Sequence, residues 1–551
     1  MRRIATDPAV VEHERSGLGA SPALAELRRR WFELGVALCA VGVGVFLTVQ
    51  LTAWPPHEDE ALALFIGRKS LPGLLDTVLD QRGGAPLHFL FAWVVAHVHG
   101  GLVGLRLVSA VFATASVPVV AVLARRIAGR ATALAATVLC SASWMLLFHG
   151  VYGRMYSLFL FTSALSFVAL LRAMERRTRS AWMFWAVAVL LCVAAHPYGA
   201  LVLATQAVYV VLRRVPLRVA VPAFATVLVV GIPFWRTDLV LAGRFDVGVA
   251  QGSSTLGSVS SIASYLEIVA GDFTAGYKPV ITIVLVLALA GICSLVFRRP
   301  RGALLVAAAV VTPLAALVIA KLGSAAPMSR HLIFLLPFFA LVVAEGVLRV
   351  ATIGRRAAPV VAAAGILALL PAEVAWGWHQ TPELYRGEPA AHVRARAEAS
   401  AWIAETARPN DVLFGYEPLY LQAWDRGGKI SKLVVPRADA KLALKTLQSA
   451  RKPLGYGVWV LDASDTTNAV RRETIPLVSP QPASEFRVEA FGPFLVIRTV
   501  EPAGCTASYL KLARRVELLS ASLGLGDGDV NLGTVLQAER RLDAEKNPPA
   551  C

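Results

Sequence analysis

Long runs of apolar residues recur along the first 376 positions of the chain and then stop. Most of these runs approach the length of about 20 residues that a helix needs to cross a lipid bilayer. The pattern therefore predicts eleven membrane-spanning helices. They cover residues 31–54, 105–124, 131–150, 157–173, 181–197, 199–212, 217–235, 279–297, 303–320, 331–349 and 358–376.

One further apolar segment, Pro86–Gly101, is predicted not to cross. It is barely long enough to do so, it contains His88, His97 and His99, and it ends in paired glycines. We predict an amphipathic helix that lies on the outer interface of the membrane. If this segment crossed, the basic loop at 125–130 would face outward, and basic loops would no longer all lie on one side of the membrane.

Basic residues gather in every second connection between the predicted spans. Cytoplasmic connections carry an excess of lysine and arginine, so this alternation places the N-terminus and these loops inside. The odd number of spans then places the region after residue 377 outside. The net charge of +17 is accounted for by topology and by contact with anionic lipids, without a nucleic-acid partner. The basic residues concerned are Arg125, Arg126, Arg130, Arg176, Arg177, Arg179, Arg213, Arg214, Arg218, Arg298, Arg299, Arg301, Arg349, Arg355 and Arg356.

The composition supports the same class of protein. Apolar residues make up 56% of the 551 residues and charged residues only 17%. These values exclude a soluble multi-domain enzyme, a disordered chain and a fibrous protein. The six cysteines form neither a zinc motif nor a disulfide scaffold. We predict an all-α polytopic membrane protein with a small C-terminal α/β domain outside the membrane.

The chain is predicted to divide into four parts. Residues 1–30 form a cytoplasmic segment, and 31–376 form the membrane module, with outer loops at 55–105 and 236–277. Residues 377–500 form an α/β appendage and 501–551 a helical tail. Within the last two parts we expect a helix at 391–407, strands at 411–416, 457–461 and 486–500, and a helical stretch at 508–542 broken at 524–528. Cys505 and Cys551 both lie outside, where they either form a disulfide or remain free thiols.

The sequence His57-Glu58-Asp59-Glu60 follows the first predicted span directly. Neighbouring carboxylates raise one another's pKa, and such a group can supply a general base or bind a divalent cation. The alternative interpretation is that acidic residues here only complement the dipole of a helix that starts at this point.

Positively charged residues occupy several predicted outer positions. Arg154, flanked by Tyr152 and Tyr156, is either an anchor at the membrane interface or a bidentate phosphate contact. Lys321 and the pair Arg330-His331 oppose the inside bias of positive charge, which favours an anionic ligand. Two further arginines and two histidines complete the outer set: Arg82, Arg106, His88 and His196.

Arg106 differs from the others because it lies within an apolar stretch, where an arginine is costly and usually has a partner. The acidic Asp59 and the basic residues are scattered along the chain, yet all map to one side of the membrane. A carboxylate that faces several cations at an interface is what transfer from a lipid phosphate requires.

Several stretches, in this order, resemble the GT-C superfamily of polyprenyl-phosphate-sugar glycosyltransferases, and most closely the branch that contains protein O-mannosyltransferases and the lipid A aminoarabinose transferase. The resemblance spans about residues 31–350. At one segment the usual histidine and first proline are replaced by Gly84 and Ala85. The stretches are HEDEALAL, RGGAPLHFL, LRLVSAVFA, ARRIAGRATALAA, YGRMYSL, AHPYGALVL and SRHLIFLLPFFALVVAEG.

The resemblance implies an inverting transfer on the outer face of the membrane. Asp59 would be the base that accepts the acceptor's hydroxyl proton, and Glu60 would support it or help to hold a divalent cation. The departing lipid phosphate would be stabilised by Arg154, Arg330, Lys321 and Arg106. Further substrate contacts would come from His57, Arg82, His88, Tyr152, Tyr156, His196 and His331. The implied partners are a polyprenyl-phosphate sugar, membrane lipid, and a glycan, glycolipid or protein acceptor.

Three other functions compete with this interpretation. A ligase for lipid-linked glycans would also use an outer arginine and histidine, but would not need the acidic pair. A transporter or flippase would place charges at mid-membrane or show repeated halves, and neither pattern is found. A non-catalytic assembly protein remains if the carboxylates only start a helix. The Arg- and Ala-rich composition suggests a bacterial plasma membrane, and neither the sugar nor the acceptor is indicated.

Overall fold

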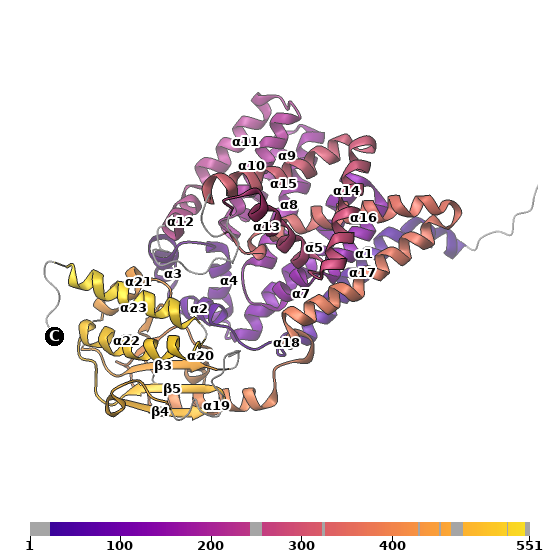
Figure 1. Cartoon of the computed structure of the whole chain (residues 1–551). Helices are drawn as coiled ribbons and strands as arrows, with labels where there is room; N and C mark the ends of the chain where they lie inside the picture. Colours follow the sequence, from indigo (N-terminus) through magenta and orange to yellow (C-terminus); the bar gives the residue numbers. More distant parts are fainter. Residues whose placement is uncertain are drawn as a thin grey trace, which may run out of the picture.

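Helices form most of the chain (Figure 1). The computed structural model describes residues 22–242, 256–321, 326–427, 430–450, 453–463, 478–525 and 527–545. Most of the predicted cytoplasmic segment 1–30 and part of the predicted outer loop 236–277 lie outside these residues.

Seven helical segments are long and apolar enough to cross a membrane. Two bent pairs raise the number to nine: α6 (Arg130–Ala142) with α7 (Trp144–Val151), bent by 52°, and α11 (Leu217–Val230) with α12 (Ile232–Ala242), bent by 56°. The seven are formed by α1 (Pro22–Gln50), α5 (Gly101–Ala128), α8 (Tyr156–Arg176), α14 (Lys278–Arg298), α15 (Pro300–Lys321), η2 (Ser329–Leu335) continued by α16 (Leu336–Ala351), and α17 (Ala358–Gln380).

The protein is therefore a multi-pass membrane protein, with seven to nine candidate spans among the described residues in place of the eleven predicted. The two remaining apolar runs are helices too, but α9 (Arg179–Ala195) has 17 residues and α10 (Gly199–Leu212) has 14. Both are shorter than the about 20 residues of a straight crossing. The apolar runs located the helices but overstated the number of full-length spans.

Small residues let two of the spans pack closely. A Cβ atom added to Gly291 of α14 would collide with the backbone of α16, and one added to Gly346 of α16 would collide with the backbone of α14. In a bilayer, where apolar burial gives little drive for helix association, such close backbone contact favours packing. Beside it, the buried Glu345 of α16 accepts hydrogen bonds from Thr132 (2.6 Å) and Ser294 (2.8 Å).

The first outer loop is largely helical. It contains α2 (Glu58–Gly67), α3 (Leu71–Asp76), η1 (Thr77–Arg82) and α4 (Pro86–His97). Helix α4 is the segment predicted to lie at the interface. Its 12 residues would extend only about 18 Å, so it is too short to cross a bilayer. Its Phe89, Ala92 and Val95 are buried against neighbouring helices that include α2.

A glycine turn, Gly83-Gly84, joins η1 to α4. Gly83 and Gly84 have φ angles of +72° and +84°, which favour glycine. A Cβ on Gly83 would collide with the backbone of Thr237 and Leu241 in α12, and the Gly84 N–H donates to the Thr237 carbonyl (3.2 Å). The turn is therefore fixed directly against α12.

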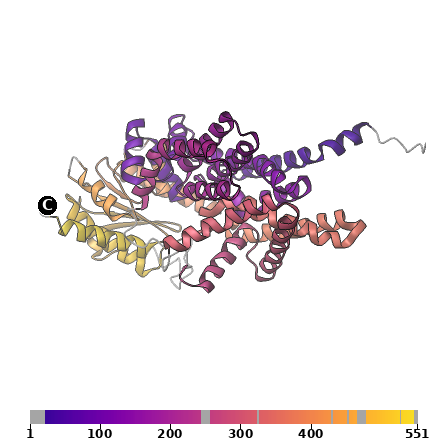
Figure 2. The ribbon, with the colours of Figure 1, turned by 90° about the horizontal axis from the view of Figure 1, so that it is seen from above.

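The C-terminal region is an α/β domain at one end of the helical module, away from the N-terminal end of α1 (Figures 1 and 2). Its five strands have the order β2-β1-β3-β5-β4. The pairs β1–β2 and β1–β3 are parallel, whereas β3–β5 and β4–β5 are antiparallel. The strands are β1 (Val412–Phe414), β2 (Val434–Val435), β3 (Gly457–Asp462), β4 (Phe486–Phe491) and β5 (Phe494–Thr499).

Helices cover both faces of this sheet because strand residues alternate between two cores. Leu413, Val458 and Val460 pack with α19 (Ala390–Thr406) and α20 (Pro418–Asp425). Trp459 and Leu461 face the other way, toward α21 (Ala440–Gln448), α22 (Thr506–Ser522) and α23 (Gly528–Asp543). The predicted strand at 486–500 is in fact a hairpin, β4 and β5, that turns at Gly492.

Helices α22 and α23, which the sequence predicted as a separate tail, pack on the sheet. Tyr509 of α22 stacks on Trp459 of β3 with ring centroids 5.5 Å apart, and Val535 of α23 belongs to the same core. The boundary at 500/501 therefore falls inside one packed unit. Cys505 is disulfide-bonded, and Cys551 lies outside the described residues.

Candidate active site

Three successive carboxylates begin α2, and each faces a different arginine. Residues adjacent in a helix point about 100° apart, so Glu58, Asp59 and Glu60 reach three separate neighbours. The helix starts here because His57 caps it: the Asp59 N–H donates to His57 Nδ1 (3.1 Å), and the His57 N–H donates to Glu60 (3.1 Å). The acidic residues thus do start a helix. The turn of that helix also points each carboxylate in a different direction.

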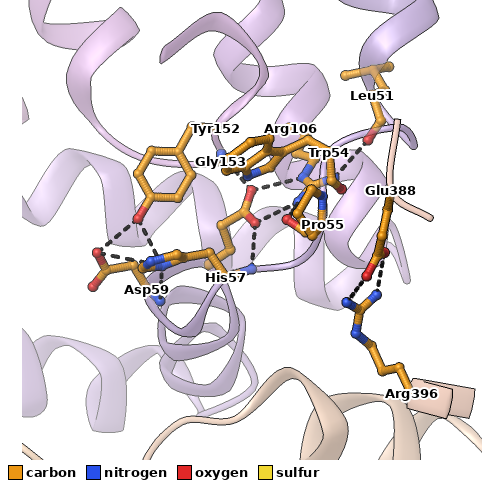
Figure 3. A network of polar contacts seen from close by, with 11 residues as sticks. Leu51, Trp54, Pro55, His57, Asp59, Arg106, Tyr152, Gly153, Glu388 and Arg396 are labelled. Atoms are coloured by element: carbon orange, nitrogen blue, oxygen red, sulfur yellow. Dashed lines mark hydrogen bonds and ion pairs between the residues drawn. The ribbon is translucent and has the colours of Figure 1, made fainter. Parts of the chain in front are cut away.

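Glu60 forms a buried ion pair with Arg106 of α5. The two side chains are 0% and 1% exposed and meet through two hydrogen bonds of 2.7 and 2.8 Å. The remaining guanidinium donors bind the carbonyls of Leu51, Trp54 and Pro55 (Figure 3). All five N–H donors of Arg106 are therefore occupied.

The Glu60 carboxylate is equally occupied. It also accepts the N–H of Gly153 at 2.7 Å, in the connection between α7 and α8. A Cβ atom on Gly153 would lie 3.0 Å from the same oxygen, so glycine permits the close approach. This differs from the sequence expectation for both residues: Arg106 is committed to Glu60 and the chain after α1, not open to a phosphate, and Glu60 is not available beside Asp59.

Asp59, unlike Glu60, remains accessible. Its side chain is 31% exposed, and one oxygen lies 2.7 Å from Arg154 Nη1. The other oxygen accepts a hydrogen bond from the Tyr152 hydroxyl (2.9 Å), which also lies 2.9 Å from His57 Nδ1 (Figure 3). The acidic loop and the YGR segment, far apart in the sequence, therefore form one polar group.

The surroundings of Asp59 keep it ionised. Burial by itself would raise the pKa of this carboxyl, but Arg154, and after it His57 and Arg330, oppose that effect. Together with the Tyr152 hydroxyl they hold the pKa of Asp59 well below its usual range. Burial and the Asp59 charge raise the pKa of Tyr152, so the phenol stays protonated and donates. Asp59 is thus an acceptor of protons and hydrogen bonds at physiological pH.

A second basic group lies next to the first and is joined to it through Tyr156. The Arg330 guanidinium lies over the Tyr156 ring, 5.6 Å from its centroid, and His331 Nε2 is 3.5 Å from the Tyr156 hydroxyl. The His196 ring lies 5.6 Å from Tyr156 and 5.7 Å from His331. Within the part of the chain that the structure describes, no carboxylate lies within ion-pair distance of Arg330.

The helix ends explain why these residues meet. Arg154 lies between α7 and α8, Tyr156 begins α8, His196 follows α9, and Arg330 lies in the first turn of η2. All of these ends lie together with the start of α2.

His88 of α4 belongs to the same region. It is buried, and its Nε2 atom has no hydrogen-bond partner. Burial and the charge of Arg154 lower the pKa of His88 to about 3, so this imidazole is neutral. A neutral ring beside Arg154 leaves the guanidinium as the dominant positive charge there.

The structure brings together most, but not all, of the residues selected from the sequence. His57, Asp59, Tyr152 and Arg154 form one group, next to Tyr156, His196, Arg330 and His331. Arg82 faces the α/β domain, with its guanidinium 5.9 Å from the ring centroid of Tyr416. The side chain of Lys321, at the end of α15, is outside the described part of the structure.

Sequence reasoning missed two residues at this site. His149, buried in α7, lies with its ring 4.5 Å from that of Tyr156. The sequence feature that could have indicated His149 is its position at the end of an apolar run, three residues before Tyr152. Arg437 lies within the α/β domain, where it reaches Glu58 through Nη1 (3.2 Å). No local pattern around Arg437 indicated that contact.

The described residues contain no group of three or more His, Cys, Asp or Glu side chains arranged to hold a metal ion. The pair expected as possible ligands, Asp59 and Glu60, point to different arginines.

Comparison with known proteins identifies the fold. No family model and no curated protein matches the sequence. Among solved structures, ArnT from Cupriavidus metallidurans bound to undecaprenyl phosphate matches with a TM-score of 0.53 and 16% identity, covering 85% of this chain and 98% of that one. Its apo structure matches with a TM-score of 0.54, 16% identity, and coverage of 86% and 98%.

The arabinofuranosyltransferase AftD from mycobacteria matches with a TM-score of 0.51 and 16% identity, covering 86% of this chain and 40% of that one. At these identities the likeness concerns the fold. The chain has the GT-C fold, as the sequence motifs indicated.

Proposed function

We propose that this chain, with its GT-C fold, is a membrane glycosyltransferase that moves a sugar from a polyprenyl-phosphate donor to an acceptor hydroxyl. One observation carries the proposal: an ionised, accessible Asp59 pairs with Arg154, while a second arginine, Arg330, lies over the neighbouring Tyr156 ring and has no carboxylate partner among the described residues. The structural match to ArnT, described as bound to undecaprenyl phosphate, supports a donor of this chemical class.

The arrangement suits an inverting displacement. The acceptor oxygen forms a bond to the anomeric carbon while the bond from that carbon to the phosphate oxygen breaks. The hydroxyl proton moves to Asp59, and the electron pair of the broken bond stays on the lipid phosphate. Arg154 and Arg330 stabilise the charge that grows there, which is where fixed positive groups contribute most to the rate.

Arg154 has two tasks in this scheme. Its Nη1 atom holds Asp59, and its buried Nε atom has no hydrogen-bond partner. The guanidinium can therefore bridge the base and the leaving phosphate, which orients the two reacting ends relative to each other. Tyr152 fixes the second oxygen of Asp59, so the carboxylate keeps one orientation.

The transfer is assigned to the outer face of a bacterial plasma membrane. The basic loops lie at the other ends of the helices, where Arg126 pairs with Glu175 (2.7 Å) and Arg125 lies 3.8 Å from Glu33. The positive-inside rule places those ends in the cytoplasm. A lipid carrier supplies activated sugar outside, where nucleotide sugars are absent.

Replacing Asp59 with Asn tests the proposal, because the change preserves size and removes the base. Purified wild type and Asp59→Asn would be offered a panel of radiolabelled polyprenyl-phosphate sugars with crude envelope acceptors. We expect transfer by the wild type and a loss of about 10²–10⁴-fold in the variant, the usual range for a general base. Binding of undecaprenyl phosphate should persist.

The matched control is Asp76→Asn, an exposed aspartate of the same outer loop. It should transfer sugar like the wild type. Equal transfer by Asp59→Asn would remove Asp59 as the base, and no transfer by the wild type with any donor would remove the proposed activity.

A further inference from the structure

The α/β domain makes a polar contact with the first turn of α2. The carboxylate of Glu58 accepts the backbone N–H of Tyr416 at one oxygen (3.2 Å) and Nη1 of Arg437 at the other (3.2 Å). Both donors come from the C-terminal domain, more than 350 positions away in the sequence. The residue next to Asp59 is therefore held by a separate structural unit.

Arg437 is itself fixed within that unit. Its Nη2 atom is paired with Glu417 and donates to the carbonyl of Val460 in β3 (3.3 Å). Its side chain is 19% exposed. A fork-shaped guanidinium that is bound at both ends has one orientation, so Arg437 presents Nη1 to Glu58 as a rigid donor.

The backbone of the domain is shaped to admit this arginine. Gly415, just after β1, has a φ angle of +78°, and a Cβ atom there would collide with the Arg437 side chain. Its N–H donates to the carbonyl of Val435 in β2 (2.9 Å), which keeps this turn next to the strand that precedes Arg437. The close approach requires glycine at this position.

Apolar contacts extend the junction along α2. Phe65 packs against Tyr416 and Trp424, with ring centroids 5.7 and 4.5 Å apart, and Leu421 of α20 joins the core formed by α2 and α4. At the far end of α2, Arg68 forms an ion pair with Asp425. The domain thus contacts α2 at its start, middle and end.

Asp59 lies between two anchored neighbours. Glu60 ties the helix to α5 in the membrane module, and Glu58 ties it to the α/β domain. A movement of about 1 Å in a reacting group can lower a rate about 100-fold.

We propose that Arg437 is a positioning residue for the reaction: through Glu58 it holds the start of α2, and with it Asp59, in the orientation that meets Arg154. This inference rests on the proposed function for its effect on turnover, but the contact itself can be tested without it. The α/β domain is then a part of the active site that sets the geometry of the base.

The test compares Glu58→Ala, Arg437→Gln and the double variant with the full-length wild type in detergent. Asp425→Ala is the matched control, because it removes a carboxylate from the same junction at the other end of α2, where the ion pair is exposed. Two properties are measured: hydrogen–deuterium exchange of peptides that cover residues 57–67, and kcat and KM for the polyprenyl-phosphate donor.

We expect faster exchange at the start of α2 in Glu58→Ala and Arg437→Gln, a kcat lowered about 10- to 100-fold, and a donor KM within about twofold of the wild type. The double variant should lose no more than Glu58→Ala, since both act through one contact. Asp425→Ala should match the wild type in both measurements.

Unchanged exchange in both single variants would overturn the inference, and so would faster exchange with an unchanged kcat. A double variant much slower than Glu58→Ala would show that Arg437 acts by another route. If Arg437→Gln does not fold, Glu58→Ala tests the inference by itself. It removes the contact with Arg437 but leaves the ion pair of Arg437 with Glu417 inside the α/β domain intact. Faster exchange with no transfer by the wild type would keep the contact and reject the proposed function alone.

Discussion

Adjacent residues of one chemical type have different tasks at the start of α2. Glu58, Asp59 and Glu60 face Arg437, Arg154 and Arg106 respectively. The sequence indicated a helix start and a candidate base, and both are compatible because a helix N-terminus favours carboxylates. It could not assign the partners, because they come from three distant parts of the chain.

Replacing Glu60 with Gln should destabilise the protein strongly. Arg106 would then be buried without a counter-charge, and breaking a buried ion pair in this way costs about 3–5 kcal/mol. We expect a clearly lower Tm in detergent, or no folded protein. Scanning fluorimetry of the purified variant measures this.

The control for this change is Glu58→Gln, two positions earlier in the same helix. Glu58 is 34% exposed, and glutamine can still accept the hydrogen bonds, so its Tm should stay close to that of the wild type. A Tm for Glu60→Gln equal to that of Glu58→Gln would show that the pair with Arg106 contributes little to stability.

Arg106 shows how far sequence reasoning reaches for a single residue. An arginine inside an apolar run was expected to have a partner, and it has one in Glu60. The same residue was also assigned to the donor phosphate because it lay on the outer side with other cations. The predicted topology indicates on which side of the membrane a residue lies. It does not indicate whether a cation there is already paired with a carboxylate or is available to a ligand.

At the scale of elements, helices were easier to predict than their ends and bends. The strands at 411–416 and 457–461 and the helix at 391–407 correspond to β1, β3 and α19. The breaks between α6 and α7 and between α11 and α12 were missed, since serine and glycine interrupt the chain there without interrupting the apolar run. The packing of α22 and α23 on the sheet was also missed, because it depends on long-range contacts.

Ending the chain after residue 504 should unfold the α/β domain. The truncation removes α22 and α23 and exposes one face of the sheet, including Trp459, which Tyr509 now covers. We expect rapid proteolysis within residues 390–504 in detergent, while the membrane module remains resistant.

A chain that ends after residue 545 keeps both helices and, like the shorter chain, lacks Cys551, so it is the matched control. It should resist protease far better than the shorter chain. Equal resistance of the two truncated chains would mean that the sheet is stable with one face uncovered, as the separate-tail interpretation assumed.

At the scale of the whole molecule, charge is distributed between two ends. Within the membrane module, loop arginines lie at the end opposite the α/β domain, where Arg126 binds Glu175. The candidate site and the α/β domain lie at the other end (Figure 1). The loop pattern in the sequence predicted this separation, because alternate connections of a helical bundle return to the same side.

Labelling with a membrane-impermeant maleimide tests the orientation. A cysteine at the exposed position 441, Lys441→Cys in α21, should react in intact cells. A cysteine at the exposed position 177, Arg177→Cys between α8 and α9, should react only after the membrane is permeabilised. Labelling of position 177 alone in intact cells would reverse the topology and place the proposed transfer in the cytoplasm.

The three carboxylates of α2 also impose an order on how the protein can be made. Arg106 is translated 46 residues after its partner Glu60, and Arg437 is translated 379 residues after its partner Glu58. Arg154 is translated between these two, so the partners emerge from the ribosome in the order 106, 154, 437. The helix that carries Asp59 is therefore secured to the membrane bundle early, and its last restraint forms only when the C-terminal domain has been translated. A nascent or prematurely terminated chain would contain the acidic loop without its final geometry.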